Sequence, residues 1–423
     1  MREMKDSGIE WVGQIPKDWD VVPHKRVMHK VKKICEQYSG EDIISLTMNG
    51  VIKRDLTAGG KMPTSFDGYQ YVKPNDLLLC LFDIDVTPRC VGVVKDYGVT
   101  SPAYSRFVMH DGYYNAYYDY LLRAIDDDKV FVHLSKNLRS SLTESDFGAI
   151  KTCVPSLAEQ ERIAAFLDAE CAEIDAVLEK TRASIEEYKK LKQAVITQAV
   201  TKGIRGDRPM KDSGSVWFEE IPCNWVMKRI KYLFHIKKDI AGKEGYTVLS
   251  ITQSGIKPKD LSKNEGQLAD NYSHYQLLNP GDFAMNHMDL LTGWVDISKY
   301  SGVTSPDYRV FVLDDTEKND SSYYLYLMQM CYFNRIFYGL GQGVSGMGRW
   351  RLQADKFLNF PVVVPPVDEQ KEIASYLNEK CSCIEVMIAK KQQYLIEIEN
   401  YKKSLIYEYV TGKKEVKTSV LAD

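Results

Sequence analysis

The sequence contains the pattern of one long helix twice, 210 residues apart, and this repeat limits the possible folds more than any other feature. Residues 156–202 contain no proline or glycine, and apolar side chains recur at steps of three, four and seven, the pattern of a coiled-coil seam. Ser156 followed by Glu159 predicts a capping box at the start of the helix. Roughly 44 residues at about 1.5 Å each give a rod about 65 Å long. Because such a rod has one apolar stripe, it needs a partner.

The second copy, residues 365–411, supplies that partner, because it repeats the pattern without a gap and matches Glu159-Gln160 with Glu369-Gln370. Two unrelated surface helices would not agree in both identity and register. We therefore expect antiparallel packing, with Ile174 and Leu178 close to Leu395 and Ile398. The predicted helix-packing residues are Ile163, Leu167, Ile174, Leu178, Ile185 and Val195 in the first copy and Ile373, Leu377, Ile384, Ile388, Leu395 and Leu405 in the second.

The repeat extends beyond the helices to a short arm that precedes each variable block. Residues 4–19 recur at 210–225, with nine of sixteen positions identical, including two tryptophans. A flexible linker would not repeat two tryptophans, so we expect each arm to pack its aromatic side chains on the domain that follows. The second arm also connects the first helix to the second variable block.

The two variable blocks, residues 20–154 and 226–364, share several short motifs in the same order. In the segments between these motifs, which serve as landmarks, the two sequences differ almost completely. Both contain Pro-Asn/Gly-Asp and Gly-Val-Thr-Ser-Pro, and the first shows β-rich runs at 42–48, 76–82, 91–95 and 106–109. Residues 113–124 and 323–338 read as helical. Divergent loops on a duplicated frame suggest two versions of one recognition task, whereas the alternative is neutral drift after duplication.

These features predict an α+β protein: two similar globular domains separated by two long antiparallel coiled-coil helices, with an internal pseudo-two-fold repeat. The predicted segments are an arm at 1–19, a first recognition domain at 20–154, a first helix at 155–203, a linker and repeated arm at 204–225, a second recognition domain at 226–364, a second helix at 365–412 and a tail at 413–423.

A polar loop precedes each helix and carries the candidate DNA-binding side chains. The second loop contains five glycines, which let the backbone approach a surface closely, and its polar side chains are of the kind that read base edges and phosphates. A mobile, solvated loop is the open alternative. The candidate DNA-binding residues are Asn137, Arg139, Ser140 and Ser141 in the first loop and Gln342, Ser345, Arg349 and Arg351 in the second.

Composition adds mainly exclusions. The net charge is −3, and since both helices are acidic, any basic surface must be local. No apolar run is long enough to span a bilayer, and the N-terminus is too polar for a signal peptide. Nine cysteines without a Cys-x-x-Cys pair fit reduced, mostly buried thiols in a cytoplasmic protein.

No catalytic or metal-binding constellation is recognisable in the sequence. The chain lacks an Asn/Asp-Pro-Pro-Tyr/Phe run, a cofactor-binding Gly-x-Gly loop, a phosphate-binding loop and a His-Glu-x-x-His motif. His24 with His29 fits surface or core better than a metal pair, and the acidic pairs fit a solvated face. We therefore expect no catalytic residue and no metal site in this chain.

The motifs taken together resemble the specificity subunit of type I restriction–modification systems, the HsdS type. The resemblance covers essentially the full length. It rests on Pro-x-x-x-Glu-Gln-x-x-Ile-Ala-x-x-Leu at Pro155 and Pro365, on the Met-Lys-Asp-Ser-Gly-x-x-Trp arms and on the Pro-Asn/Gly-Asp-Leu/Phe elements, each present twice. The first helix begins Pro155-Ser156 where the second has Pro365-Pro366, and the first loop lacks glycines, so the resemblance is weaker there.

This resemblance implies a non-catalytic DNA-recognition subunit. Each variable block would be a target-recognition domain that reads one half of a bipartite site on double-stranded DNA. The helices would set the spacer and dock two modification subunits, which carry S-adenosylmethionine and methylate adenine. Restriction subunits would add ATP- and Mg-dependent translocation and cleavage, so the chain itself would hold no cofactor. A DNA-modifying enzyme and a protein-binding coiled-coil adaptor are the alternatives; the missing motifs disfavour the first and the paired, diverged domains the second.

Overall fold

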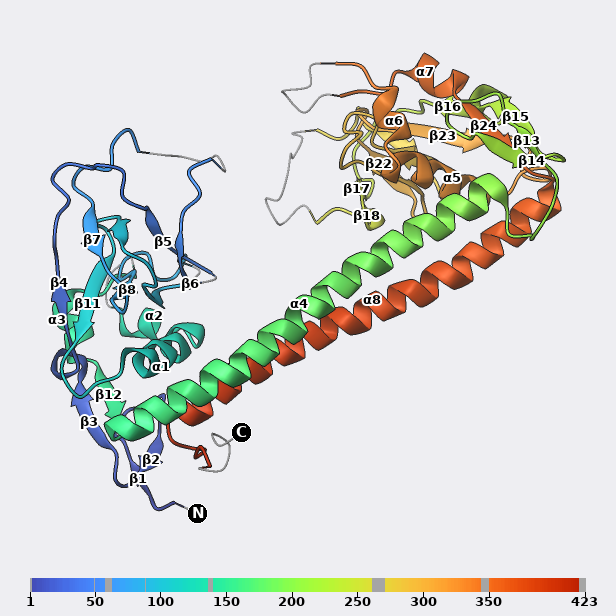
Figure 1. The fold of residues 1–423 in the computed structure, drawn as a ribbon. Coiled ribbons are helices and arrows are strands. Elements are labelled where there is room, and N and C mark those ends of the chain that lie inside the picture. Colours follow the sequence, from blue (N-terminus) through green and yellow to red (C-terminus); the bar gives the residue numbers. More distant parts are fainter. Residues whose placement is uncertain are drawn as a thin grey trace. The chain divides into compact units, whose positions relative to one another are not determined.

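The computed structural model describes residues 2–48, 50–57, 63–87, 89–135, 140–260, 271–343 and 350–417. The chain forms two compact units: unit 1 contains Met1–Arg182 and Gln393–Asp423, and unit 2 contains Ala183–Gln392. Each unit holds one variable block and parts of both long helices (Figure 1). Helices and antiparallel strands mix in both, which confirms the predicted α+β class. Because the units divide each long helix, they do not follow the predicted segment boundaries, and that finer division stays a prediction.

Unit 1 contains the arm, the first variable block, the first part of the first long helix and the last part of the second. Its elements are β1 (Met4–Asp6), β2 (Gln14–Pro16), β3 (Asp20–Pro23), η1 (His24–Arg26), β4 (Met28–Val31), β5 (Ile44–Thr47), β6 (Gly50–Lys53), β7 (Gln70–Val72), β8 (Leu77–Leu79), β9 (Val91–Val93), β10 (Gly98–Thr100), β11 (Ser105–Met109), α1 (Asn115–Asp127), α2 (Val130–Leu134), α3 (Glu144–Ala149), β12 (Lys151–Val154) and the first part of α4 (Leu157–Lys202).

Unit 2 repeats this order of elements. They are β13 (Met210–Asp212), β14 (Glu220–Pro222), β15 (Val226–Arg229), η2 (Ile230–Tyr232), β16 (Phe234–Lys237), β17 (Leu249–Thr252), β18 (Gly255–Pro258), β19 (Gln276–Leu278), β20 (Phe283–Met285), β21 (Val295–Ile297), β22 (Gly302–Thr304), β23 (Arg309–Leu313), α5 (Ser321–Phe333), α6 (Ile336–Gly339), α7 (Ala354–Asn359), β24 (Pro361–Val364) and α8 (Val367–Val410), whose last part belongs to unit 1.

Each unit is built around one four-stranded antiparallel sheet. The strand order is β4-β11-β8-β9 in unit 1 and β16-β23-β20-β21 in unit 2. Pairs β7–β10 and β19–β22 and hairpins β5–β6 and β17–β18 accompany these sheets. The first and last strands of each variable block also pair with each other, β3 with β12 and β15 with β24, so each block closes at the point where its long helix begins.

The shared landmarks have structural roles. A side chain on Gly98 would lie 2.3 Å from the Asp42 carbonyl oxygen, and one on Gly302 would lie equally close to the Thr247 carbonyl. Asn75 and Gly281 both have positive φ angles, which explains why this turn accepts only Asn or Gly in the two copies. These motifs therefore preserve the frame and do not themselves mark a binding site.

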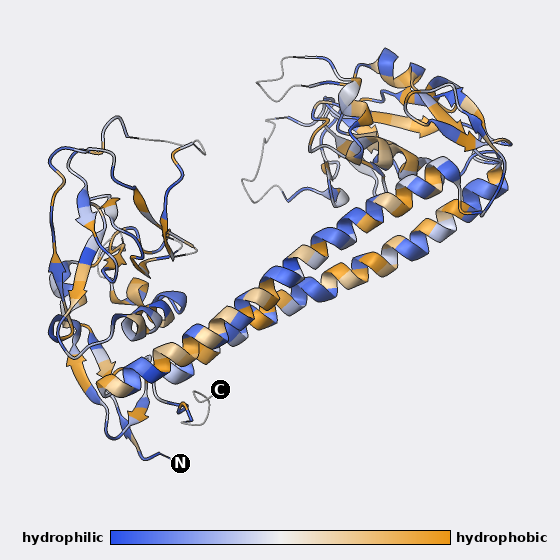
Figure 2. Ribbon diagram, viewed as in Figure 1, coloured by the Kyte–Doolittle hydropathy of each residue, from blue (hydrophilic) through white to orange (hydrophobic). Residues whose placement is uncertain are grey.

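Both long helices alternate between apolar and polar residues along their length (Figure 2). In unit 1, Ile174 and Leu178 belong to one apolar cluster, against which Leu395 and Ile398 pack half-buried. Asp175 pairs with Lys402 and Arg182 with Glu399, both at 2.6 Å in the same unit; the partner number falls along α8 as it rises along α4, so the helices run antiparallel there. The predicted helix-packing residues are fully buried at Ile163, Leu167, Ile174, Leu178, Ile185, Ile373, Leu377, Ile384 and Leu405, and half-buried at Val195, Ile388 and Leu395.

The predicted capping box at the start of α4 is only half present. The backbone N–H of Glu159 donates to the Ser156 hydroxyl at 3.3 Å, as expected of a capping residue. The Glu159 carboxylate does not return to the Ser156 backbone. It accepts a hydrogen bond from Trp19 Nε1 at 3.0 Å and pairs with Arg2, because the folded arm brings both donors to it.

Unit 2 repeats this clamp between arm and helix. Trp225 Nε1 donates to Glu369 at 3.0 Å, and Arg208 pairs with the same carboxylate. Trp19 and Trp225 are both completely buried, so each arm packs one tryptophan on the domain that follows it, as predicted, whereas Trp11 is only half-buried and Trp217 is exposed. The repeated Glu-Gln of the helices thus contributes the acidic half of a buried contact.

Candidate nucleic-acid interface

The candidate DNA-binding loop of unit 2 is closed at its base by a short antiparallel bridge. Gln342 and Arg351 exchange both backbone hydrogen bonds, at 2.9 and 3.0 Å. The Gln342 side chain is exposed and the Arg351 side chain is half-buried. Ser345 and Arg349 lie outside the described residues, so their proposed DNA contacts stay predictions.

Trp350 anchors this loop to the domain. Its Nε1 donates to the Tyr338 carbonyl at 2.7 Å, and its ring lies 5.7 Å from that of Tyr338. A Cβ on Gly341 would lie 2.4 Å from Trp350 Nε1, so only glycine permits this approach. Trp350 packs half-buried against the core of unit 2. Gly341 is therefore needed for the packing of Trp350, in addition to the close backbone approach that the sequence suggested for the glycines of this loop.

Two further basic side chains lie at the base of the same loop. The Arg309 guanidinium donates to the Leu352 carbonyl at 2.7 Å, and the Leu352 N–H donates to the His287 carbonyl at 2.9 Å. Burial, followed by the charges of Arg309 and Arg351, lowers the pKa of His287 to about 4. Burial also lowers the pKa of Arg309 to about 10, so this guanidinium stays charged at neutral pH.

The base of the glycine loop is therefore electropositive. Within the described residues, no carboxylate forms an ion pair with Arg309 or Arg351. His287 remains neutral near pH 7, and its Nδ1 has no hydrogen-bond partner there. Arg351 is half-buried beside an exposed loop and lacks an internal counterion, which fits a polyanionic ligand, whereas the buried Arg309 contributes its charge from below the surface.

The loop of unit 1 has the same backbone position as that of unit 2 but carries different side chains. The Leu142 N–H donates to the Leu81 carbonyl at 2.8 Å, as Leu352 does to His287 in unit 2. Ser140 and Ser141 are half-buried, and the Ser140 carbonyl accepts from the Ile84 N–H at 3.1 Å. Asn137 and Arg139 lie outside the described residues. Backbone equivalence thus aligns the two loops, although the loop of unit 2 is longer.

The cluster of Arg309, Arg351 and neutral His287 in unit 2 has no counterpart in unit 1. Leu81, Ser105 and Ser141 occupy the positions of His287, Arg309 and Arg351. The partly buried arginines of unit 1 are neutralised instead: Arg106 pairs with Asp76 at 2.6 Å, and Arg89 pairs with Asp127 at 3.1 Å. The two units therefore present different electrostatic surfaces on one frame.

Sequence reasoning missed His287 and Arg309. The signal was present, because Leu81 and Ser105 are their counterparts at offsets of 206 and 204. Because the numbering offset between the two blocks changes from 206 to 204, the sequence alone does not show which residues are equivalent. The register of the paired strands does show it.

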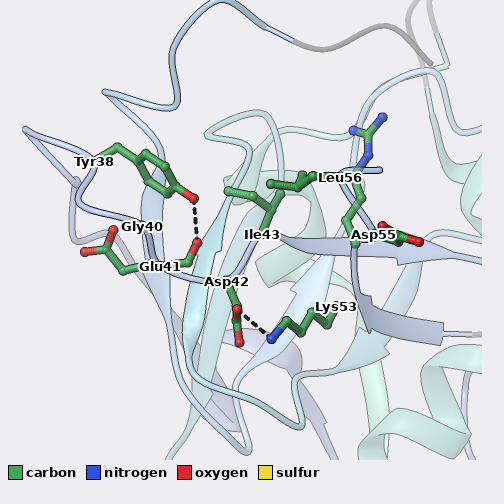
Figure 3. Close-up of a pocket in the computed structure, with 9 residues that line it drawn as sticks. Tyr38, Gly40, Glu41, Asp42, Ile43, Lys53, Asp55 and Leu56 are labelled. Carbon is green, nitrogen blue, oxygen red and sulfur yellow. Dashed lines mark hydrogen bonds and ion pairs between the residues drawn. The ribbon is translucent and has the colours of Figure 1, made fainter. Parts of the chain in front are cut away.

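A cavity of about 500 Å³ in unit 1 offers no comparable chemistry. It lies beside β5 and β6, where Lys53 pairs with Asp42 at 2.7 Å and the Tyr38 hydroxyl donates to the Glu41 carbonyl at 2.8 Å (Figure 3). Its lining carries both signs of charge and is already engaged in internal contacts. We assign it no ligand.

The structure also bears on the other expectations from composition. In the described ranges, no helix is long and apolar enough to cross a membrane. No group of three or more potential ligand side chains gathers around a metal-sized space in that part of the chain. All nine cysteines are free thiols, seven of them buried.

Comparisons with known proteins agree on one family. The family model "Type I restriction modification DNA specificity domain" matches residues 222–397. The chain is 26% identical over 286 residues to the type I restriction enzyme MjaVIII specificity subunit of Methanocaldococcus jannaschii, an alignment spanning 64% of each protein. It is 22% identical to the putative MjaX specificity subunit of the same organism, over 96% of each.

The fold agrees with a solved chain from a study of the complex assembly and conformational transition of the type I R-M system. The TM-score is 0.68 at 13% sequence identity, over 95% of this chain and 99% of the other. At that identity the likeness concerns the fold alone. The matched domain model over residues 222–397, the similar specificity subunits and the shared fold together support one assignment, a specificity subunit of the HsdS family of type I restriction–modification systems.

Proposed function

We propose that this chain is a non-catalytic DNA sequence-specificity subunit, in which the variable blocks of units 1 and 2 each read one half of a bipartite DNA site. The observation that carries the proposal is the pair of equivalent loops on one frame. In unit 2 the loop adjoins Arg351, Arg309 and a neutral His287, whereas unit 1 has serine and leucine at those positions. Unequal loops on equal frames are what two unequal half-sites require.

The long helices would set the spacer between the half-sites and dock two modification subunits. Regular antiparallel helices can hold the two domains at a set separation, because each residue adds about 1.5 Å to the length of a helix. The modification subunits would supply S-adenosylmethionine and the methyl transfer to adenine. Restriction subunits would supply ATP- and Mg-dependent cleavage, which leaves this chain without a cofactor. DNA is the shared ligand of all three components.

Exchanging residues 20–154 for the same block of another family member tests independent reading. The expected result is a methylated motif that changes in one half and keeps the other. The reciprocal exchange of residues 226–364 should change the opposite half. Removing whole turns from one long helix should alter the spacer alone. Methylome sequencing of cells that express each complex provides the readout, and a change in both halves after one exchange would contradict independent reading.

Arg351→Ala tests the base-reading role of the glycine loop. A guanidinium that bridges guanine O6 and N7 contributes roughly 1–3 kcal/mol of discrimination. We therefore expect loss of preference at one base position of one half-site, measured by methylation of a randomised target library. Arg349→Ala is examined in parallel, since one of the two arginines is proposed to read a base.

The control for this experiment is Lys318→Ala, which removes an exposed cation paired with Asp315 outside the loop. It should leave the base preference unchanged. If Arg351→Ala lowers methylation uniformly, the side chain holds a phosphate; if neither arginine variant changes methylation, the proposed base reading by these arginines is wrong.

A further inference from the structure

A run of positive charge opens each variable block, outside the candidate loops. Residues 25–33 of unit 1 contain five lysines and arginines and no acidic residue, in a chain where acidic residues are slightly in excess. Residues 228–238 of unit 2 contain five more cations, followed by Asp239. We call these two sets the basic strips; they consist of Lys25, Arg26, Lys30, Lys32 and Lys33 in unit 1 and Lys228, Arg229, Lys231, Lys237 and Lys238 in unit 2.

The two basic strips occupy equivalent structure. Each includes a single-turn helix, η1 or η2, and the edge strand that follows it, β4 or β16, and the strip of unit 2 also includes Lys228 and Arg229 at the end of β15. Lys25 corresponds to Lys231 and Lys32 to Lys238 at a constant offset of 206. The variable blocks have diverged at most other positions outside the landmarks. Repetition of exposed cations at equivalent positions therefore points to a shared role.

Most of these cations lack an internal counterion. Lys25, Arg26 and Lys32 are exposed, and no ion pair within the described residues joins any of them to a carboxylate. The same holds for Lys228 and Lys238 in unit 2. The exceptions are Lys30, which pairs with Glu144 at 3.5 Å, and Lys237, which pairs with Asp282 at 2.6 Å.

Protection of a sheet edge explains only part of the pattern. Lysines on edge strands discourage pairing with another chain, and β4 and β16 are edge strands. Edge protection concerns the strand itself, yet every Lys, Arg, Asp or Glu position from 25 to 33 and from 228 to 238 is a lysine or arginine. Lys25, Arg26 and Lys228 also lie outside the edge strands. A ligand of negative charge accounts for both facts.

The strips adjoin the elements that follow the candidate loops. In unit 1, α3 begins two residues after Leu142, and its Glu144 pairs with Lys30. In unit 2, α7 begins shortly after Arg351, and its Asn359 accepts a hydrogen bond from Arg229 at 3.5 Å. Each basic strip is thus connected to the candidate interface through one short helix.

We propose that the basic strips bind phosphates of the DNA duplex beside the bases that the loops read. The inference rests on the proposed function, since it assigns a second contact to the same ligand. A docking site for a protein partner would need an apolar centre, whereas these strips are dominated by separate cations. Lysine acts as a point charge toward phosphate and carries no sequence information, so the strips add affinity without changing specificity.

Salt dependence of DNA binding measures this contact directly. Each phosphate neutralised by a protein cation contributes about 0.9 to the slope of log K against log salt concentration. The triple variant Lys25→Gln, Arg26→Gln, Lys32→Gln should therefore reduce the slope by up to about 2.7. Lys228→Gln, Lys231→Gln, Lys238→Gln should do the same from unit 2. The base preference of the complex should not change.

The experiment uses the complete chain assembled with its modification subunits and a labelled duplex, with fluorescence anisotropy recorded from low to moderate salt. The matched control is Lys17→Gln, Lys211→Gln, Lys318→Gln, which makes the same charge change at exposed lysines elsewhere. Lys17 pairs with Glu3, Lys211 donates to the Cys223 carbonyl and Lys318 pairs with Asp315. Its slope should equal that of the parent, and circular dichroism checks that all variants are folded.

Three other outcomes are distinguishable. If the parent complex does not prefer its target over unrelated DNA, the proposed function itself fails. If the parent is specific but both strip variants keep its slope, the strips do not bind DNA and the inference is wrong. If the variants lose modification subunits on gel filtration while the assembled fraction keeps the parental slope, the strips dock protein, which also overturns the inference.

Discussion

Glu369→Ala is expected to lower the free energy of unfolding of unit 2 by about 3–5 kcal/mol, the range for removing one partner of a buried ion pair. Glu369 is 1% exposed and accepts from Trp225 Nε1 while pairing with Arg208. Alanine would leave a buried indole N–H and a largely buried guanidinium without their acceptor. The measurement is urea unfolding followed by tryptophan fluorescence, since unit 2 contains four of the six tryptophans.

The control is Glu372→Ala, three residues further along α8. Glu372 also pairs with an arginine, Arg205, at 2.8 Å, but both side chains are about half exposed. Exposed ion pairs contribute about 0–1 kcal/mol, so this variant should unfold almost as the parent does. Equal effects of the two variants would mean that burial of the Glu369 clamp does not stabilise the unit.

Leu178→Ala is expected to destabilise unit 1 by about 2–5 kcal/mol, the cost of truncating a buried leucine. Leu178 is 4% exposed in the apolar cluster that α4 shares with α8 within this unit. The effect includes the lost burial and the cavity left between two rigid helices. Hydrogen exchange of the amides in residues 157–182 reports the change in local unfolding free energy.

Val177→Ala provides the comparison at the neighbouring position. Val177 is 40% exposed, so its truncation removes little buried surface, and alanine is the better helix former. The expected change is within about 0.5 kcal/mol. Ile388→Ala removes a half-buried side chain of unit 2, so hydrogen exchange over the unit 2 part of α8 should show an effect between those of the two unit 1 variants. If Leu178→Ala is as stable as Val177→Ala, Leu178 does not belong to the seam.

Periodicity and repetition predicted the elements of the fold well. The first helix was expected at 155–203 and runs from Leu157 to Lys202; the second was expected at 365–412 and runs from Val367 to Val410. The β-rich runs and the helix after them correspond to β5, β8, β9, β11 and α1. These features depend on local sequence pattern, which each copy of the repeat reports independently.

The partners of polar side chains could not be predicted in this way. Glu159 was interpreted as part of a capping box, a role that depends on residues three positions away. Its carboxylate instead meets Arg2 and Trp19, more than 100 residues distant in sequence. A local pattern predicts that a carboxylate is present, but only the folded arm determines which donors reach it.

The candidate interface shows the same division between sequence and structure. By itself the sequence determined the duplicated frame, the two long helices and the positions of the loops before them, because these follow from periodicity and repeated identity. Only the tertiary structure decided that His287 and Arg309 lie beside Arg351, and that Arg106 is neutralised by Asp76. The physical reason is that electrostatic environment depends on distance and burial in space. Strand register sets both, and spacing along the chain does not reveal them.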